Sequence, residues 1–149
     1  MEIDPRGPRF GASITTIVLA VVLVTSSIWL LAAQGLVFAA GSAFGLRYAP
    51  YGWLYRRLAR PRLGPPAELE PEAPPRFAQT VGLAFAAVGV AGYATGLTWL
   101  GAAATAAALA AALLNAVFGF CLGCEVYLLI RRIQPGVTAL VPAHADKED

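Results

Sequence analysis

Two residues of this chain have types and a spacing that can carry redox chemistry. Cys121 and Cys124 are its only cysteines, and they form a C-x-x-C pair within the sequence NAVFGFCLGCEVYLLIRR. Residues three apart lie on one face of a helix, so the two sulfurs can form a disulfide or hold one soft metal ion together. The spacing therefore indicates either reversible thiol chemistry or metal binding.

Redox exchange is the interpretation that needs no further ligand. A structural zinc site takes four ligands, and the only histidine, His144, lies near the C-terminus. A metal held by Cys121 and Cys124 would need a second copy of the chain or a partner to complete its coordination. The alternative is that both cysteines are small buried apolar residues. Gly119 and Gly123 disfavour this alternative, because they leave room for a molecule to approach the sulfurs.

Two polar residues flank the pair. Glu125 is the only acid between residues 73 and 145, and a carboxylate in an apolar segment is a candidate functional group. It either carries a proton to the leaving thiol, which makes Cys121, Cys124 and Glu125 the predicted catalytic set, or pairs with the nearby arginines. Asn115 either bonds across helices or satisfies the backbone where a helix breaks, and we favour the second role.

The composition indicates the kind of element that must position these residues. Of the 149 residues, 58% are hydrophobic and 13% are charged, against about 25% charged in a typical soluble domain. No charged residue occurs over 11–46 or over 77–120, and about 20 apolar residues suffice for one helical crossing of a bilayer. The chain is therefore expected to be a single all-α membrane domain over residues 1–149.

Breaks in the apolar pattern predict a bundle of four transmembrane helices. The expected spans are 12–33, 36–50, 77–97 and 99–130. Gln34-Gly35 is taken as the polar break after the first span, and the second span is expected to be short or kinked near Pro50. The aromatic and basic segment 51–62 predicts a cytoplasmic interfacial helix, with a solvated loop as the alternative. A Pro-rich cytoplasmic linker over 61–76 and a mobile tail over 134–149 complete the expected organisation.

The last span is too long to cross a bilayer as one straight helix. Residues 99–130 would extend roughly 48 Å at 1.5 Å per residue, whereas the hydrocarbon core is about 30 Å thick. The helix therefore either projects into the cytoplasm or breaks between Asn115 and Gly123. A break would place Cys121 at the N-terminus of a short helix, where the helix dipole lowers the pKa of a thiol.

The basic residues predict the orientation. They occur near the N-terminus, over 47–76 and near the C-terminus, so paired crossings would place all of them on one side. The positive-inside rule makes that side cytoplasmic. The chain is expected to be a multi-pass protein of the inner membrane with both termini in the cytoplasm. The first apolar run is longer than the 7–15 residues of a signal-peptide core, so we expect it to be retained.

Three stretches together carry a family resemblance. The opening IDPRGPRFGA, the central YGWLYRRLARPRLGPPAELEPEAPPRFAQ and the run NAVFGFCLGCEVY resemble, in this order, the bacterial membrane domain-of-unknown-function family numbered 4395. The resemblance covers nearly the whole chain, from Ile3 to about Arg132. It implies that Cys121, Cys124 and their glycines are the motif positions. The association of family members with thioredoxin-like and sulfurtransferase proteins further implies thiol or sulfur chemistry.

The first functional hypothesis is a membrane thiol–disulfide or persulfide exchange protein. Cys121 attacks a partner disulfide, Cys124 resolves the mixed disulfide and Glu125 manages protons. The expected partners are the lipid bilayer and a thioredoxin-like or sulfurtransferase protein, without a nucleic acid and without a cofactor. The alternatives are a carrier of a soft metal or sulfur species, with Cys121 and Cys124 as ligands, and an accessory subunit of a larger membrane complex.

Overall fold

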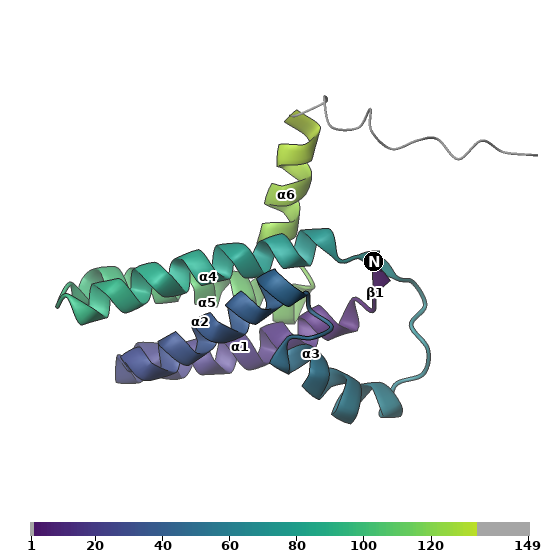
Figure 1. Ribbon diagram of the computed structural model, residues 1–149, viewed down its shortest axis with the longest axis horizontal. Helices are drawn as coiled ribbons and strands as arrows, with labels where there is room; N and C mark the ends of the chain where they lie inside the picture. Colours follow the sequence, from purple (N-terminus) through teal and green to yellow (C-terminus); the bar gives the residue numbers. More distant parts are fainter. Residues whose placement is uncertain (1, 134–149) are drawn as a thin grey trace, which may run out of the picture.

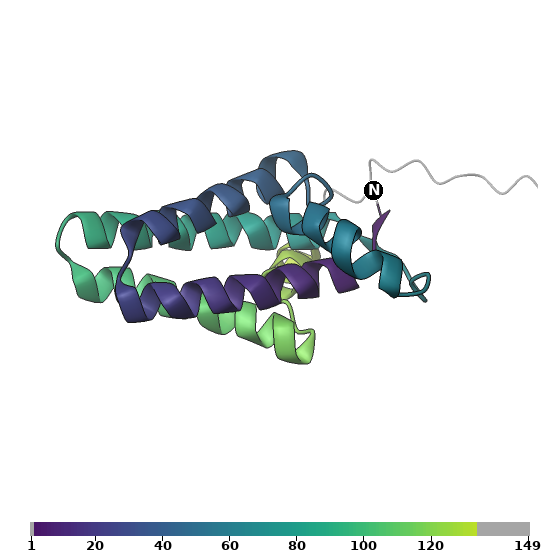
Figure 2. The same cartoon turned by 90° about the horizontal axis from the view of Figure 1, so that it is seen from below.

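Four apolar helices run side by side along the long axis of the molecule (Figure 1). The computed structural model describes residues 2–133. The four long helices are α1 (Arg6–Thr25), α2 (Ile28–Phe44), α4 (Ala73–Ala94) and α5 (Thr98–Phe118). α1 packs on α5, α5 on α4 and α4 on α2, whereas α1 and α2 touch over a shorter stretch and diverge away from their connecting turn (Figure 2). The buried core includes Leu19, Val22, Leu31, Phe38 and Tyr93.

The two ends of the bundle differ in composition. The turns α1–α2 and α4–α5 lie together at one end, where no residue is charged (Figure 1). The opposite end carries the start of α1, the end of α2, the start of α4 and the end of α5. We call this opposite end the basic end, because arginines follow or precede each of these helix termini except that of α5.

The first turn lies earlier than the sequence predicted. α1 ends at Thr25, where the Ser26 N–H donates to the Val22 carbonyl at 2.7 Å, and the Ser27 hydroxyl accepts from the Leu30 N–H to begin α2. The expected spans 12–33 and 36–50 were therefore wrong in their shared boundary. Short hydroxyl side chains that cap a helix form this turn, whereas Gln34 lies inside α2.

Gln34 can lie inside α2 because other helices satisfy its amide. Its side chain is 1% exposed, donates from Nε2 to Thr15 Oγ1 at 3.3 Å and accepts at Oε1 from the Tyr51 hydroxyl at 2.7 Å. A buried polar group with such partners does not require a break in the helix. The Gln34-Gly35 pair thus marks a helix contact rather than a turn.

Side chains of α4 and of the segment before it form hydrogen bonds at the C-terminal end of α2. α2 ends at Phe44 rather than continuing to Pro50. The Arg76 guanidinium donates to the Ser42 carbonyl, at 2.8 Å from Nη2 and 3.3 Å from Nε, and to the Ala43 carbonyl at 3.1 Å. The buried Glu72 carboxylate accepts from the Leu46 N–H at 2.8 Å. A cation at the carbonyl end of a helix opposes the negative pole of its dipole.

Residues 50–62 are helical, as one of the two sequence interpretations proposed. α3 (Pro50–Leu54) continues into a π-helical segment, η1 (Tyr55–Ala59), and a 3-10 turn, η2 (Arg60–Arg62). Pro50 begins α3, at the first position of a helix, where its missing N–H has no cost. The segment lies beside the basic end of the bundle, where α1 and α2 have diverged (Figure 2).

The Pro-rich linker contains one feature that the sequence did not predict. β2 (Glu70–Pro71) pairs in antiparallel orientation with β1 (Glu2–Ile3), with Ile3 opposite Glu70. The linker also ends earlier than the expected residue 76, because α4 begins at Ala73. Pro74 and Pro75 occupy the first turn of α4, where proline is compatible with a helix.

Asp4 connects the N-terminal strand to the segment 50–62. Its carboxylate accepts from the Arg6 backbone N–H at 3.0 Å, pairs with the Arg6 guanidinium at 3.2 Å and accepts from the Tyr55 hydroxyl at 2.8 Å. Burial raises the pKa of Asp4, but the hydrogen bonds from Arg6 and Tyr55 and the positive charge of Arg6 together lower it below the ordinary 3.8. Tyr55 shows the converse effect, since burial and the neighbouring carboxylate raise its pKa.

We expect this contact to be sensitive to acid in a defined range. A carboxyl whose pKa is lower in the folded chain stabilises the fold above its ordinary pKa of 3.8, and the contribution is lost as the pH falls through the lower folded value. An NMR titration of the Asp4 carboxyl should therefore give a pKa below 3.8. Tyr55→Phe should raise that pKa by removing one donor, and titration of wild-type Asp4 at or above the ordinary value would contradict the expectation.

The predicted last span is divided into two helices. α5 ends at Phe118, and Gly119 has φ +68, a left-handed conformation that glycine adopts without strain, while its N–H donates to the Asn115 carbonyl at 3.0 Å. α6 (Leu122–Ile133) then leaves the bundle at a steep angle (Figure 1). Of the two alternatives for 99–130, the break is the one observed. The expected tail over 134–149 lies outside the described residues.

The fold is all-α apart from the short β1–β2 pair. Within residues 2–133, three helices are long and apolar enough to cross a membrane, namely α1, α4 and α5. α2 is apolar as well, with 17 residues. These helices make the chain a multi-pass membrane protein.

Candidate functional site

The fold brings the two cysteines together at the start of α6. Cys121 immediately precedes α6, Cys124 lies in its first turn, and the two are joined in a disulfide with their Cα atoms 5.1 Å apart. The Cys124 N–H points at Cys121 Sγ at 3.4 Å. Cys121 Sγ therefore lies where free N–H groups and the positive pole of the helix dipole stabilise negative charge.

Glycine at position 123 sets where α6 crosses α4. A Cβ atom added to Gly123 would lie 2.5 Å from Ala78 Cβ and 2.6 Å from Ala78 Cα. No side chain fits at this crossing, so the glycine within the Cys-x-Gly-Cys sequence has a structural role. The crossing holds the disulfide against the start of α4, and Phe77 and Tyr127 pack beside it with ring centroids 5.7 Å apart.

Glu125 is next to the disulfide in sequence and is exposed. It lies in the first turn of α6, and its backbone N–H donates to the Cys121 carbonyl at 3.0 Å. An acid in the first turn is favourable with the helix dipole. Among residues 2–133 the one ion pair is Arg6–Asp4, so the expected pairing of Glu125 with arginines is not seen there. Its role in proton transfer stays a prediction.

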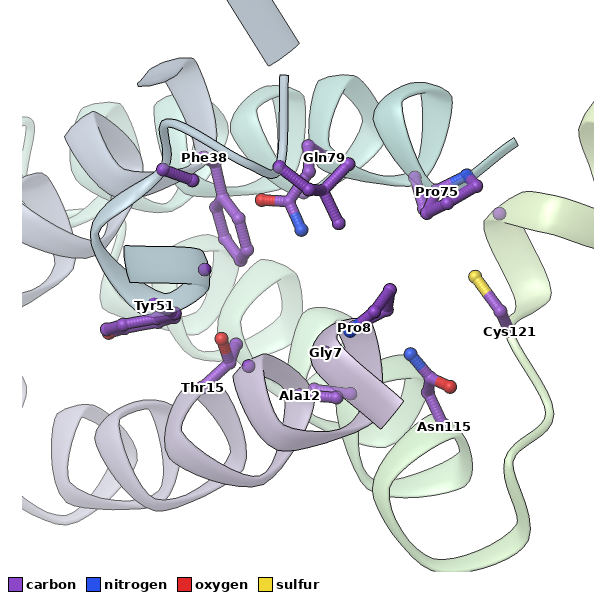
Figure 3. Close-up of a pocket in the computed structure, with 18 of the residues that line it drawn as sticks. Gly7, Pro8, Ala12, Thr15, Phe38, Tyr51, Pro75, Gln79, Asn115 and Cys121 are labelled. Atoms are coloured by element: carbon purple, nitrogen blue, oxygen red, sulfur yellow. The ribbon is translucent and has the colours of Figure 1, made fainter. Parts of the chain in front are cut away.

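A large cavity lies between the helices, next to Cys121. It has a volume of about 810 Å³ and is lined by residues of α1, α2, α3, α4, α5 and the start of α6, and at the basic end by residues of β1, η1, η2 and the linker. Cys121 is on its wall, with the sulfur towards the interior of the cavity, whereas Cys124 does not line it (Figure 3). One sulfur of the disulfide therefore faces the inside of the bundle.

Small side chains create this space. The wall residues without a bulky side chain are Gly7, Gly11 and Ala12 on α1, Ala78 and Gly82 on α4, and Ala107, Ala108, Ala111 and Ala112 on α5. Hydrogen and methyl side chains are too short to fill the space between neighbouring helices. Free volume therefore remains where α1, α4 and α5 carry such residues. The sequence contains this signal as alanine and glycine at helical spacing on these helices.

The cavity lining is mostly apolar, with its charged residues (Glu2, Asp4, Arg47, Arg56 and Arg60) in segments at the basic end. Gln79 of α4 and Asn115 of α5 extend their amides into it from opposite walls (Figure 3). Neither amide forms a side-chain hydrogen bond within residues 2–133. The backbone carbonyl of Asn115, and not its side chain, takes part in the helix break. The expected backbone role of the Asn115 side chain was therefore wrong, and the amide remains available to a bound molecule.

The described residues offer little to a metal ion. No group of three or more His, Cys, Asp and Glu side chains gathers anywhere within residues 2–133. His144, the remaining nitrogen ligand considered from the sequence, lies outside that range. A metal bound here would have two protein sulfurs from this part of the chain.

The fold and the site define an all-α multi-pass membrane protein with a cysteine pair of which one member, Cys121, lies on the wall of a cavity. The model of one protein family, the domain of unknown function DUF4395, matches residues 3–132, and the chain belongs to this family. The family resemblance of the sequence is thereby confirmed. No curated protein and no solved structure matches the chain.

Proposed function

We propose that this protein exchanges thiols and disulfides at the membrane surface through Cys121 and Cys124. The observation that supports this proposal best is the pairing of the two sulfurs at the N-terminus of α6, beside a large cavity. The pair has the spacing needed for reversible closure and a position that favours a reactive thiolate. A buried structural cysteine pair would need neither.

The proposed orientation follows from the two unlike ends of the bundle. With α1, α2, α4 and α5 as four crossings, the charge-free turns lie on one side and the arginines flanking the helices lie on the other. The positive-inside rule then makes the basic end cytoplasmic, in a bacterial inner membrane. α2 has 17 residues and is about 26 Å long, a little shorter than the hydrocarbon core of about 30 Å. It can cross where the bilayer thins locally or where polar residues that flank the helix extend to the headgroups.

The segment 50–62 and α6 are proposed to lie in the membrane interface. Trp53 and Arg57 of the first segment stack, with the guanidinium 5.8 Å from the ring centroid, a pairing suited to the headgroup region. α6 leaves the bundle at a steep angle, so it runs along the membrane plane when the bundle crosses the membrane (Figure 1). Its exposed Leu129 and Ile133 then contact lipid, and Arg131 and Arg132 contact phosphates.

The exchange proceeds in two balanced steps. The Cys121 thiolate attacks one sulfur of a partner disulfide, forms a mixed disulfide and releases the other partner sulfur, which takes a proton. The Cys124 thiolate then attacks Cys121 Sγ, forms the Cys121–Cys124 disulfide and releases the second partner thiol. Run in reverse, the same steps oxidise a partner dithiol. The partner is a soluble thioredoxin-like or sulfurtransferase protein that approaches the basic end, and Glu125 is placed to exchange protons with solvent near the pair.

A redox titration of the purified protein in lipid nanodiscs tests this function. Alkylation and mass spectrometry should show one reversible Cys121–Cys124 bond, with a midpoint of about −120 to −270 mV, the range of exchange-active protein disulfides. With glutathione disulfide, Cys124→Ser should accumulate a mixed disulfide on Cys121, because the resolving thiol is missing. Cys121→Ser serves as the matched control and should react more slowly, since Cys124 does not precede the helix. Absence of a reversible bond at every potential would refute the proposal.

A further inference from the structure

The cavity indicates a second reactant for the proposed exchange reaction. Cys121 lines the cavity and Cys124 does not, so one sulfur of the pair faces the apolar interior of the bundle (Figure 3). A soluble protein is too large to enter a cavity of about 810 Å³, and exchange with such a partner does not require one. The cavity therefore points to a small second reactant that reaches the cysteines from within the membrane.

Its size and lining restrict the occupant to a lipid-soluble molecule. About 810 Å³ is within the range of small-molecule sites, which is about 300–1,000 Å³. The walls from α1, α4 and α5 are glycine and alanine over most of their area, with Phe38 and Phe85 as larger apolar neighbours. These three walls offer few partners to a charged or sugar-like ligand, whereas a flat ring with an apolar tail fits them. The charged lining residues, Glu2, Asp4, Arg47, Arg56 and Arg60, come from segments at the basic end.

The polar groups indicate a molecule with hydrogen-bond acceptors on its ring. The Gln79 and Asn115 amides reach the cavity from α4 and α5, and each carries an N–H₂ group that can donate to a carbonyl oxygen (Figure 3). Asn115 and Cys121 flank the break between α5 and α6, so a ring bound by Asn115 lies at the end of the cavity that holds the sulfur. Two amides on opposite walls match two carbonyl groups on one ring.

We propose that the cavity binds a quinone, which exchanges electrons with the Cys121–Cys124 pair. This inference rests on the proposed thiol–disulfide function and adds its second substrate. In the reaction, two S–H bonds break and one S–S bond forms, so the dithiol loses two electrons and two protons. The quinone ring takes both electrons, and its two carbonyl oxygens each gain one proton to give the quinol. The new disulfide then oxidises the dithiol of a soluble partner by the reverse exchange steps.

Anaerobic single-turnover kinetics can test this reaction directly. The protein is reduced in nanodiscs, freed of reductant and mixed with decylubiquinone in the presence of a chelator. The fully substituted ring of this quinone has no open carbon to which a thiol could add. We expect one quinol to form per Cys121–Cys124 pair oxidised. Quinone absorbance measures the quinol formed, and alkylation of the remaining thiols measures the pairs oxidised. Cys121→Ser should form no quinol.

A matched pair of alanine variants on α5 tests whether the cavity is the site. Ala111 lines the cavity, whereas Ala110, its neighbour, is exposed outside it. Ala111→Phe should lower the rate of quinol formation by about tenfold or more, which corresponds to about 1.4 kcal/mol, while Ala110→Phe should leave it unchanged. Both variants should still exchange with glutathione disulfide at the wild-type rate.

The outcomes separate this inference from the proposed function. Normal exchange with glutathione disulfide without any quinol would overturn the quinone site and leave the exchange function standing. An acyl chain as the real occupant would give that result. Equal quinol formation in Ala111→Phe and Ala110→Phe would place the reaction outside the cavity and overturn the inference. Failure of both reactions in wild-type protein would refute the proposed function itself.

Discussion

Gly123→Ala should weaken the attachment of α6 to the bundle and slow the chemistry of the cysteine pair. The added methyl group would lie 2.5 Å from the Ala78 methyl carbon and 2.6 Å from the Ala78 backbone. The backbone of α4 cannot turn aside as a side chain can. Overpacking of this kind costs about 1–3 kcal/mol. We expect a loss of that size in the free energy of unfolding, measured by denaturant titration in mixed micelles, together with slower exchange with glutathione disulfide.

Two further variants separate this packing effect from the general effect of replacing glycine. Gly64→Ala is the matched control, because nothing lies within 4 Å of a Cβ atom there, and it should change neither stability nor exchange. Ala78→Gly, combined with Gly123→Ala, removes the clash between the two methyl groups but leaves the clash with the backbone of α4, so it should restore part of the loss. Full activity and stability of Gly123→Ala alone would show that α6 does not pack on α4 at this crossing.

Arg76→Ala should destabilise the junction between α2 and α4. The guanidinium donates three hydrogen bonds to the Ser42 and Ala43 carbonyls, at 2.8, 3.3 and 3.1 Å, and these carbonyls lie in the last turn of α2. Without it the carbonyls lose a charged donor, and hydrogen bonds of this type contribute about 1.5–3 kcal/mol. We expect a loss of that size in the free energy of unfolding and faster hydrogen exchange in the last turn of α2.

The matched control removes a charge without removing a contact of this kind. Arg132 is exposed on α6, so Arg132→Ala should leave the unfolding free energy of the bundle close to that of the wild type. Arg76→Lys keeps the charge but loses the fork that reaches both carbonyls, so its stability should fall between wild type and Arg76→Ala. Equal stability of all three variants would contradict the role assigned to Arg76.

The general fold could be predicted because a bilayer imposes strong constraints on sequence. The charge-free stretches 11–46 and 77–120 contain α2, α5, most of α1 and nearly all of α4. A helix over 51–62 and a break between Asn115 and Gly123 were also predicted as alternatives, the first from its aromatic and basic residues and the second from the length of the last span. These features depend on local chemistry that a single sequence records.

The boundaries that failed depend on contacts between distant residues. Gln34 has the polarity of a turn residue, and only the partners Thr15 and Tyr51 explain its place inside a helix. Pairing of β1 with β2 likewise joins segments about 70 residues apart, Glu2–Ile3 and Glu70–Pro71, through backbone groups. Neither contact leaves a trace in local spacing.

The two cysteines of the site could be predicted from the sequence, but the cavity beside them could not. The C-x-x-C spacing identified Cys121 and Cys124 from the sequence alone, and the proposed exchange chemistry stays a prediction. The cavity required knowledge of which helices face one another. Gly11, Gly82, Ala111 and Ala112 meet on the cavity wall from three different helices, and that meeting is a property of the whole bundle.

The charge-free turns at one end of the bundle have a consequence for biogenesis. If the four helices cross the membrane as proposed, α1–α2 and α4–α5 can each enter the bilayer as a preformed hairpin whose tip carries no ionised group. Transfer of one Arg or Asp to the bilayer centre costs about 2.5–3.5 kcal/mol on insertion scales, and neither tip incurs this cost. The α1–α2 hairpin can therefore partition from the ribosomal exit path into lipid before α4–α5 is synthesised, and packing of the two hairpins, α1 on α5 and α2 on α4, becomes the last event of maturation.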